Sequence, residues 1–559
     1  PEFESLRGAI HTQTLKALIG PPFNLKTMTS VQAAVLPLVP RLSLSHKHSP
    51  DHPRDLLVRA KTGTGKTLAF LIPAVERRLR AIEEKTTRDI REGGHKDDAQ
   101  NRGRISKLIQ RTQGGVLIIS PTRELAQQIA VEAQRLTLHH NMQVRLFVGG
   151  ESKARQMRDW MKETRDIIVA TPGRLRDLLE TEPEIRKGLG HVHTLVLDEC
   201  DTLLDMGFRD DLDAITDALP APPERQTFLF SATMNRAVSQ TAARILSQNH
   251  HGIDTVGQDD SPVHAHIPQY HTILPNAADQ LPHLARLIVH DQLTNAGKSK
   301  IILFASTTKL TSLLTSTLKE LQKTFPVTRT ALYEIHSRKE QHARTRTSDK
   351  FRTDKSAASI LVTSDVSARG VDYPGVTRVI QLGIPSTSEQ YIHRVGRTGR
   401  AGSQGRGDLV LLPWEVGFVS WQLTEVPLKP VTISELESQV IELAQRFEQN
   451  PQLVPGGKAR LGDFGKDLVE KVKSIPQVIE NMRVDEESIE DTFSSLLGFY
   501  ATRDGDLRVS KNVILEGLKD WVTTTYGLPT PPYLSESFLA KMGFSSQNRG
   551  KFSMASTSK

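Results

Sequence analysis

Ala60-Lys61-Thr62-Gly63-Thr64-Gly65-Lys66-Thr67 lies between two short apolar runs, Asp55–Arg59 before it and a second run that begins at Leu68. The first run predicts a strand and the second predicts the start of a helix. A glycine-containing turn between strand and helix directs backbone N–H groups at phosphate oxygens, and the helix N-terminus adds partial positive charge. The stretch therefore predicts a phosphate-binding loop at the start of an α/β domain.

Two side chains of this loop have predicted roles with a nucleotide. Lys66 is expected to reach the β- and γ-phosphates, and the Thr67 hydroxyl is expected to bind magnesium. The other candidate ligands are Thr62, Gly63, Thr64 and Gly65. The strict pattern begins with Gly where this chain has Ala60, so an ordinary Gly/Thr turn is the alternative interpretation.

The bulk composition is typical of a soluble globular protein with some loop-rich parts. The 559 residues predict two or more domains, and the formal charge of +8 is compatible with a polyanionic partner. The single cysteine, Cys200, excludes an intrachain disulfide and a cysteine-based zinc site. No run of 18 apolar residues occurs, so we expect no membrane span. Because the sequence begins with Pro1 rather than Met, we expect a fragment or a processed form.

Five further apolar runs alternate with helical patterns in the first half of the chain. They predict strands at Val116–Ser120, Val144–Val148, Asp166–Ala170, Thr194–Leu197 and Thr227–Phe230. Short buried strands that alternate with helices indicate a parallel sheet, whose ligands bind beyond the carboxyl ends of the strands. The runs are followed in order by the polar clusters PTREL, GG, TPGRL, DECD and SAT. We therefore expect these clusters to gather at one edge of the sheet.

Residues 83–113 are rich in charge and poor in large apolar side chains. Such a segment buries too little surface to offset the entropy of ordering it, so we expect an exposed, mobile insertion. Its basic residues are Arg102, Arg104, Lys107 and Arg111. They suit either a solvated loop, which we favour, or a contact with RNA.

The strand pattern restarts after a turn-rich segment and then gives way to helices. Strands are predicted at Lys300–Phe304, Ala331–Ile335, Ser359–Val362, Arg378–Gln381 and Asp408–Leu412, without a second phosphate loop. Past residue 421 the helical runs Ser434–Glu448, Glu487–Tyr500 and Val513–Tyr526 follow without strand signals. The predicted organisation is a first domain at 1–252, a linker at 253–270, a second domain at 271–420, a helical extension at 421–545 and a polar tail at 546–559.

Asp198 and Glu199 directly follow the apolar run Thr194–Leu197. A carboxylate beside a phosphate loop holds magnesium, usually through water, and Asp198 is the candidate. Glu199 is the candidate base that orients and deprotonates the water attacking the γ-phosphate. The alternative interpretation is an acidic pair that caps a helix.

The segment His393–Arg400 carries two arginines three residues apart, Arg397 and Arg400. On a helix this spacing places both guanidiniums on one face, which suits a triphosphate. The domain with the phosphate loop has no such pair, so catalysis is expected to need both domains on one nucleotide. A basic surface stretch is the alternative.

These motifs occur in the order found in DEAD-box RNA helicases of superfamily 2, which this sequence resembles from Gln32 to Arg400. The motifs that carry the resemblance are Thr29 with Gln32, AKTGTGKT, PTRELA, GG, TPGRL, DECD, SAT, TSDVSARGVD and HRVGRTGR. The resemblance implies an α/β fold of two tandem RecA-like parallel-sheet domains followed by an α-helical C-terminal extension. It also implies the cofactors ATP and Mg²⁺, a monomeric enzyme, and RNA held by sequence-independent backbone contacts.

The resemblance also implies roles for individual residues. Gln32 reads the adenine edge and Asp372 lies at the nucleotide, while Ser231, Thr233 and His393 couple the nucleotide site to RNA binding. The residues that face RNA are Pro121, Thr122, Arg123, Gly149, Gly150, Thr171, Gly173, Arg174, Gln341, Arg344, Thr363 and Arg369.

The helical part, with Phe538–Phe544 near its end, further resembles the fungal mitochondrial branch of RNA chaperones, which help self-splicing introns fold. We therefore expect an RNA-stimulated ATPase that unwinds short duplexes in the mitochondrial matrix, with nucleus or cytoplasm as alternative locations. An ATP-dependent RNA clamp and a catalytically dead RNA-binding scaffold are the alternative functions.

Three departures from the family pattern are Cys200 in place of Ala, Asn24-Leu25 ahead of Gln32, and Ser337 after His336. Cys200 is compatible with an oxidation-sensitive site, although a structural role is favoured.

Overall fold

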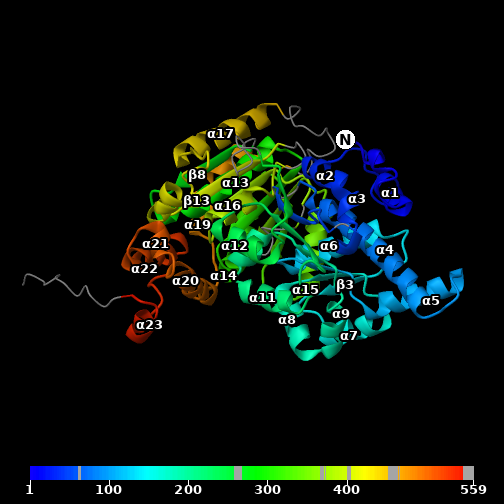
Figure 1. The fold of residues 1–559 in the computed structure, drawn as a ribbon. Coiled ribbons are helices and arrows are strands. Elements are labelled where there is room, and N and C mark those ends of the chain that lie inside the picture. The colour runs from blue at the N-terminus through cyan, green and yellow to red at the C-terminus, as the bar shows by residue number, and fades with distance from the viewer. Residues whose placement is uncertain are drawn as a thin grey trace, which may run out of the picture. The chain divides into compact units, whose positions relative to one another are not determined.

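The computed structural model describes residues 1–48, 50–60, 64–256, 267–365, 371, 373–399, 404–450, 464 and 466–544. Thr62, Gly63, Arg369, Asp372 and Arg400 lie outside these residues, as does the predicted tail. The chain divides into two compact units, whose boundary in the sequence falls between Val256 and Ile267. In Figure 1 the colours of the first unit run from blue to green and those of the second from green to red.

The first unit is built on a seven-stranded parallel sheet in the order β3-β4-β2-β5-β6-β1-β7. The strands are β1 (Asp55–Arg59), β2 (Val116–Ile119), β3 (Val144–Phe147), β4 (Ile167–Ala170), β5 (Thr194–Leu197), β6 (Gln226–Ser231) and β7 (His250–Asp254). The six predicted strands are confirmed to within one residue at either end. Sequence analysis missed β7, because His250, His251 and Gly252 give this edge strand no apolar pattern.

Helices cover both faces of this sheet, so alternate strand residues enter two different cores. In β2, Val116 and Ile118 belong to one cluster and Leu117 and Ile119 to the other. The helices are α1 (Thr12–Ile19), α2 (Ser30–Val35), α3 (Val39–Leu42), α4 (Lys66–Glu92), α5 (Ala99–Thr112), α6 (Arg123–Leu136), α7 (Lys153–Lys162), α8 (Pro172–Thr181), α9 (Pro183–Leu189), α10 (Cys200–Asp205), α11 (Arg209–Asp217) and α12 (Arg236–Ile245).

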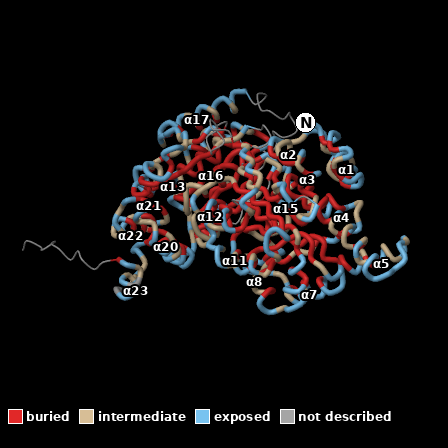
Figure 2. Tube along the Cα trace, viewed as in Figure 1, coloured by how far each residue is buried: buried red, intermediate tan, exposed pale blue. Residues whose placement is uncertain are grey.

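The prediction of a structureless insertion at 83–113 is wrong. Helix α4 continues to Glu92, and α5 packs back against it. Ile90, Ile105 and Ile109 form a small buried cluster between the two helices, although most of α5 is exposed or half-buried (Figure 2). The composition argument failed because Ile105 and Ile109, one helical turn apart on α5, pack on Ile90 of α4 even though most of the surrounding residues are polar or charged.

The second unit contains a seven-stranded sheet with the same permutation of strands, β10-β11-β9-β12-β13-β8-β14. Its strands are β8 (Gln269–Ile273), β9 (Ser299–Ala305), β10 (Ala331–Ile335), β11 (Ala358–Thr363), β12 (Arg378–Leu382), β13 (Arg406–Leu411) and β14 (Lys429–Pro430). The five predicted strands are confirmed, with ends shifted by up to two residues. The linker prediction at 253–270 is wrong at both ends, because β7 extends into it and β8 begins within it. The short β14 also contradicts the expectation of no strand past residue 421.

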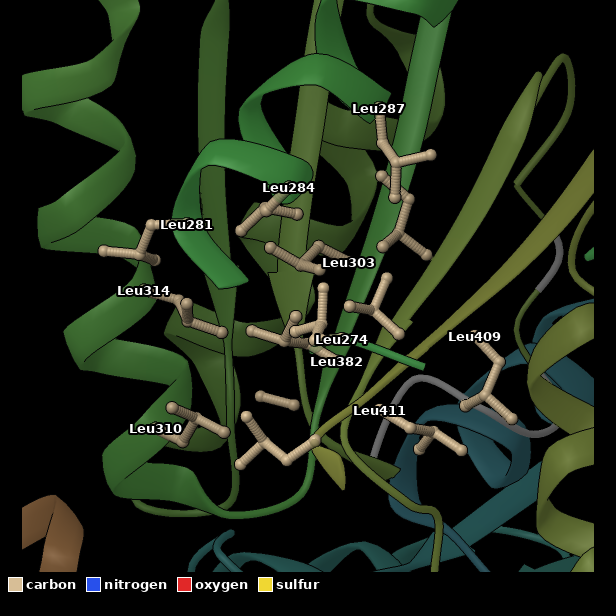
Figure 3. Close-up of a cluster of buried hydrophobic side chains, with 14 of the residues drawn as sticks. Leu274, Leu281, Leu284, Leu287, Leu303, Leu310, Leu314, Leu382, Leu409 and Leu411 are labelled. Atoms are coloured by element: carbon tan, nitrogen blue, oxygen red, sulfur yellow. The ribbon is translucent and has the colours of Figure 1, made fainter. Parts of the chain in front are cut away.

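The helical extension is part of the core of the second unit. Figure 3 shows leucines of α13 (Gln280–Thr294) and α14 (Thr308–Leu321) packed against β9, β12 and β13. The extension residues Phe493, Leu497 and Leu518 belong to the same buried cluster. The remaining helices are α15 (Gln341–Thr353), α16 (Ser388–Val395), α17 (Ile433–Gln449), α18 (Leu468–Lys473), α19 (Ile475–Glu480), α20 (Glu486–Tyr500), α21 (Asp504–Leu507), α22 (Lys511–Asp520), a π-helical turn at Trp521–Thr525 and α23 (Glu536–Lys541). Within the described part of the chain, no helix combines the length and apolar character needed to cross a membrane.

Candidate functional site

The predicted phosphate loop lies between the end of β1 and the start of α4, beside the end of β6. Gly65 precedes the helix with a φ of 85°, in the left-handed region that favours glycine. A Cβ atom at this position would lie 2.6 Å from Nε2 of Gln32, so only glycine allows this approach. Lys66 then opens α4, and its Nζ donates to the carbonyl of Ala60 at 3.2 Å. The ammonium group of Lys66 therefore lies against the residue that follows β1.

Asp198 lies at the end of β5, next to the end of β6 in the sheet, and is buried with Lys66. Burial raises the pKa of Asp198 to about 7, while the positive charge of Lys66 limits that rise. No group of three or more His, Cys, Asp or Glu side chains among the described residues could hold a metal ion alone. Mg²⁺ commonly binds through one or two protein oxygens together with substrate phosphates and water. Thr67, in the first turn of α4, and Asp198 fit that coordination.

Glu199 has an unusual backbone conformation, with φ 49° and ψ 56° in the left-handed region. Its side chain is buried, and its Oε2 accepts a hydrogen bond from the Thr202 hydroxyl at 3.3 Å. A non-glycine residue in this region costs about 1 kcal/mol or more and is found mainly at functional sites. The strain and burial of Glu199 agree with its candidate role as the base.

The turn after β6 is tied to the acidic helix α10. The Asp201 carboxylate accepts hydrogen bonds from the amides of Ala232 and Thr233 at 3.2 and 3.0 Å, and from the Thr233 hydroxyl at 3.1 Å. The Ser231 hydroxyl donates to the carbonyl of Thr233 at 2.7 Å. Sequence analysis did not select Asp201, although its place at the end of DECD was the available signal. Through Asp201, a shift of the Ser-Ala-Thr turn would reach the helix that Glu199 precedes.

Gln32 joins α2 to the phosphate loop. Its Oε1 accepts from the amide of Thr29 at 2.9 Å, and its Nε2 donates to the carbonyl of Gly65 at 3.1 Å. Thr29 and Gln32 form a reciprocal capping box at the start of α2. Asn24, one of the departures upstream, has a φ of 55°, which asparagine tolerates.

The predicted RNA-facing residues of the first unit follow three neighbouring strands, β3, β4 and β2. The Thr122 hydroxyl caps α6 by accepting from the amide of Leu125 at 3.2 Å, after the buried Pro121. The next residue, Arg123, lies against the loop after β3: a Cβ on Gly149 would lie 2.9 Å from Nη2 of Arg123. The structure therefore brings the PTREL and GG clusters together.

A second link joins the loops after β3 and β4. Arg174 donates from Nη1 to Oε1 of Gln156 at 2.8 Å and to the carbonyl of Glu151 at 3.2 Å. Gln156 in turn donates from Nε2 to the carbonyl of Val148 at 3.0 Å. No motif marked Gln156, so the sequence carried no signal for its bridging role. The other predicted residues at this edge are Gly150, Thr171 and Gly173.

In the second unit, the predicted RNA-facing residues also lie near strand ends. Gln341 and Arg344 occupy the first turns of α15, and Thr363 ends β11, where its hydroxyl donates to the carbonyl of Ser364 at 3.1 Å. Ser337, a departure from the family pattern, shares a hydrogen bond of 3.2 Å with the hydroxyl of Thr308. His393 lies in the last turn of α16.

The prediction that Arg397 and Arg400 share one face of a helix is wrong. Helix α16 ends at Val395, with Gly396 at its C-terminal cap, and Arg397 lies in the turn that follows. Nε of Arg397 donates to the carbonyl of His393 at 3.2 Å. The i, i+3 argument failed because it assumed that the helix continued through glycine, the residue that commonly ends helices.

Cys200 is buried at the start of α10, and burial raises the pKa of its thiol. A protonated, inaccessible thiol reacts slowly with oxidants. The environment of Cys200 therefore favours a structural role over a redox role.

Comparisons with known proteins agree with this arrangement. The family model described as DEAD/DEAH box helicase matches residues 29–241, and the helicase conserved C-terminal domain matches residues 280–402. DEAD-box ATP-dependent RNA helicase 25 of Oryza sativa subsp. japonica is 37% identical over 92% of this chain and 73% of its own length. The mitochondrial ATP-dependent RNA helicase mss116 of Aspergillus fumigatus is 34% identical over 97% of this chain and 77% of its own length.

Solved structures extend the likeness to the helical extension. The structure of Mss116p bound to ssRNA and AMP-PNP aligns with a TM-score of 0.74 and 28% identity, over 98% of this chain and 96% of that one. A structure of Mss116 bound to ssRNA and UDP-BeF gives a TM-score of 0.73 and 27% identity, with the same coverage. Both alignments span the two sheets and the C-terminal helices.

Proposed function

Because the chain belongs to the DEAD-box ATP-dependent RNA helicases, we propose that it hydrolyses ATP in an RNA-stimulated manner to unwind short RNA duplexes. The observation that carries this proposal is the sheet order of the first unit. The ends of β1, β6 and β5 hold Lys66, Ser231 and Glu199, and the ends of β2, β4 and β3 hold the predicted RNA residues. One sheet edge thus presents two adjoining sites.

The proposed reaction assigns a task to each group of the first site. The loop amides and Lys66 bind the β- and γ-phosphates, and Glu199 takes a proton from the water whose oxygen attacks the γ-phosphorus. The bond between that phosphorus and the β,γ-bridging oxygen then breaks. Thr67 and Asp198 would hold Mg²⁺, which would supply charge neutralisation of the phosphates. Arg397 and Arg400 add positive charge in the transition state, which requires the second unit to reach the nucleotide.

Asp201 connects this chemistry to RNA. It holds the Ser-Ala-Thr turn to α10 through three hydrogen bonds, so RNA-dependent movement of that turn would be felt by the backbone that carries Glu199. RNA bound across both units would bend and lose its partner strand, and hydrolysis would release it. We assign Arg123, Arg174, Gln341 and Arg344 to sequence-independent contacts with the RNA backbone.

The test is ATP turnover with and without RNA in Glu199→Gln and in the matched control Glu92→Gln, an exposed residue at the end of α4. We expect Glu199→Gln and Lys66→Ala to abolish RNA-stimulated turnover and Glu92→Gln to leave it unchanged. Phosphate release near the wild-type rate from Glu199→Gln would refute its role. If the wild-type protein binds RNA but shows no RNA-stimulated turnover, the protein is a scaffold.

A strand-displacement assay separates an unwinding enzyme from an ATP-dependent clamp. We expect the wild-type protein to displace the shorter strand of an RNA duplex with ATP, and Glu199→Gln to bind RNA without multiple turnovers. A wild-type protein that hydrolyses ATP and stays on RNA without displacing the strand would be a clamp.

We also propose that structured mitochondrial intron RNA is the physiological substrate, which the fungal mitochondrial relative supports. The expected result is that the protein accelerates ATP-dependent splicing of a self-splicing intron from a misfolded starting state. Unchanged splicing alongside normal duplex unwinding would remove the intron proposal and leave the helicase proposal intact.

A further inference from the structure

A large cleft opens at the amino ends of the strands in the second unit, at the edge opposite to the predicted RNA residues of its strand ends. It lies between the loop before β9, the connection from α15 to β11, and the loop before β12, which are three neighbouring strands. Its volume is about 720 Å³. This size falls within the range of small-molecule sites, about 300–1,000 Å³.

The cleft is lined by more positive than negative charge. Four cationic residues, Lys298, Lys300, Arg352 and Lys355, line it with one carboxylate, Asp354, which gives the lining a formal charge of +3. Arg352 also pairs with Asp349 at 2.9 Å, so the excess positive charge rests mainly on the lysines. The oxygens of Asp354 already accept hydrogen bonds from the hydroxyl of Tyr333 at 2.8 Å and the amide of Ser356 at 2.6 Å. Asp354 keeps its negative charge and attracts Lys300, but it offsets only one of the four positive charges.

Lys300 is the cation that distinguishes this cleft from a solvated basic surface. It projects from β9 and is only 6% exposed. Its Nζ donates to the carbonyl of Arg352 at 3.1 Å and lies 4.9 Å from the ring centre of Phe351. Within the described ranges it forms no ion pair with a carboxylate, and burial lowers its pKa. A largely buried ammonium without a direct ion pair is costly, so an anion placed in the cleft would recover part of that cost.

The lining also indicates which anion fits. The other lining residues are glycine, proline, serine and threonine, such as Ser299, Thr353 and Ser359. A site without aromatic side chains cannot stack bases, which single-stranded nucleic-acid sites use. Hydroxyl groups and lysines together suit the oxygens of a compact, highly charged anion.

We propose that this cleft binds a small phosphorylated anion carrying two or more phosphate groups. Lys300 forms the floor of the site, and Lys298 and Lys355 contact the ligand from its rim. The site is separate from the nucleotide loop of the first unit, and the proposal does not depend on the proposed helicase activity. Ligand binding in this cleft would make the second unit respond to the concentration of phosphorylated metabolites.

The probe is inorganic tripolyphosphate, titrated calorimetrically into the full chain with the nucleotide loop saturated by ADP and Mg²⁺. We expect one further binding event that Lys300→Met weakens at least tenfold. Methionine fills a similar volume, so the fold should be retained, as circular dichroism would verify. The matched control is Lys319→Met, an exposed lysine on α14, which should change affinity less than twofold.

A second variant keeps the test independent of the buried position. Lys298→Ala combined with Lys355→Ala changes only exposed side chains and should weaken binding about three- to tenfold, more at low salt than at high salt. Absence of the second binding event, or equal affinity in all variants, would overturn the proposal. If a blunt RNA duplex displaces tripolyphosphate and Lys300→Met weakens duplex binding by the same factor, the cleft is an RNA contact and the small-anion proposal is wrong.

Discussion

The two sheets of this protein have the same strand order, yet within the described residues only the first is joined to a predicted phosphate loop. In both, the first strand in sequence lies between the sixth and the seventh, and the third lies at an edge. Strand β8 corresponds to β1, and α13 corresponds to α4, so Gln280 occupies the position of Lys66. The second sheet therefore differs from the first at the strand ends where the first would hold a nucleotide.

The helical extension occupies that place. Gln280 accepts a hydrogen bond from Nε1 of Trp521 at 2.7 Å, and the carbonyl of Ala277 accepts one from the Thr525 hydroxyl at 2.8 Å. Glu415, in the segment after β13, accepts from the Tyr500 hydroxyl. The cavity left between these groups and the ends of β12 and β13 is about 20 Å³, enough for about one water molecule.

The other half of each sheet behaves alike. The loops after β3 and β4 are joined through Arg174 and Gln156, and Arg123 after β2 lies against Gly149. In the second unit Glu334 accepts from the Ser312 hydroxyl at 2.7 Å beside His336. The two sheets thus differ at the strand ends that would hold a nucleotide. In both units, polar side chains link the loops at the ends of one half of the strands. At the ends of the other half, the first unit has the predicted nucleotide site and the second unit is filled by the helical extension.

The largest expected effect contrasts Lys66 with Gln280. Lys66→Ala should reduce RNA-stimulated ATP turnover by at least about 100-fold, because it removes charge aimed at the phosphates. Gln280→Ala should change turnover by less than about threefold, while it lowers the stability of the second unit by about 1–3 kcal/mol through the unpaired indole N–H of Trp521. Turnover rates and urea unfolding of both variants provide the measurement. A large catalytic loss in Gln280→Ala would break the comparison.

Substitution of Trp521 tests whether the extension fills the space at the strand ends of the second sheet. It is 2% exposed, so Trp521→Ala should lower the free energy of unfolding of the second unit by about 3–5 kcal/mol. Trp421, half exposed and stacked on Arg508, is the matched control and should cost about 1 kcal/mol or less. Chemical denaturation followed by circular dichroism measures both. Equal losses would show that the extension is attached to the sheet without filling it.

Glu415 is expected to make the free energy of unfolding of the second unit depend on pH. Burial raises its pKa to about 7, above the ordinary 4.5 of an unfolded glutamate, so the folded state favours the protonated acid. The stabilising contribution is fully present below pH 4.5 and is lost as pH rises through about 7, by about 2–3 kcal/mol. Glu415→Gln should remove this part of the pH dependence between pH 5 and pH 7.5, as measured by urea unfolding. The exposed control Glu425→Gln should retain it.

Substitution of Gln156 tests the half of the first sheet whose strand ends resemble those of the second. Gln156→Leu removes the link between Arg174 and the carbonyl of Val148, so RNA half-saturation should rise about three- to tenfold while the maximal ATPase rate is kept. The exposed control Gln100→Leu should change neither quantity. A fall in the maximal rate at unchanged RNA affinity would place Gln156 outside the RNA site.

The sequence predicted most of the architecture because buried parallel strands are continuous apolar runs. Strands β7 and β14 lie at the sheet edges and β8 lies next to one, and none of the three has a continuous apolar run, so only pairing partners distant in sequence define them. The helical hairpin at 83–113 was not predicted because the charge-rich composition of the whole segment concealed three isoleucines that form a small core.

The candidate site was predictable wherever a motif occupies consecutive residues, as in the phosphate loop and DECD. Gln156 could not be predicted, since its function comes from contacts with Arg174 and Val148 that no local pattern encodes. The helix assumed for Arg397 failed for a different reason: residue spacing alone does not say where a helix ends, and the signal that did, Gly396, was passed over.

The shared core of the second sheet and the extension has a consequence for synthesis on the ribosome. Leucines near residue 281 belong to the same buried cluster as Phe493 and Trp521, which are translated more than 200 residues later. At about 5–20 residues per second, this interval lasts about 10–40 s, during which the nascent sheet exposes an apolar edge to chaperones. A premature stop codon before Trp521 would therefore yield a product marked for degradation, not a shorter working protein.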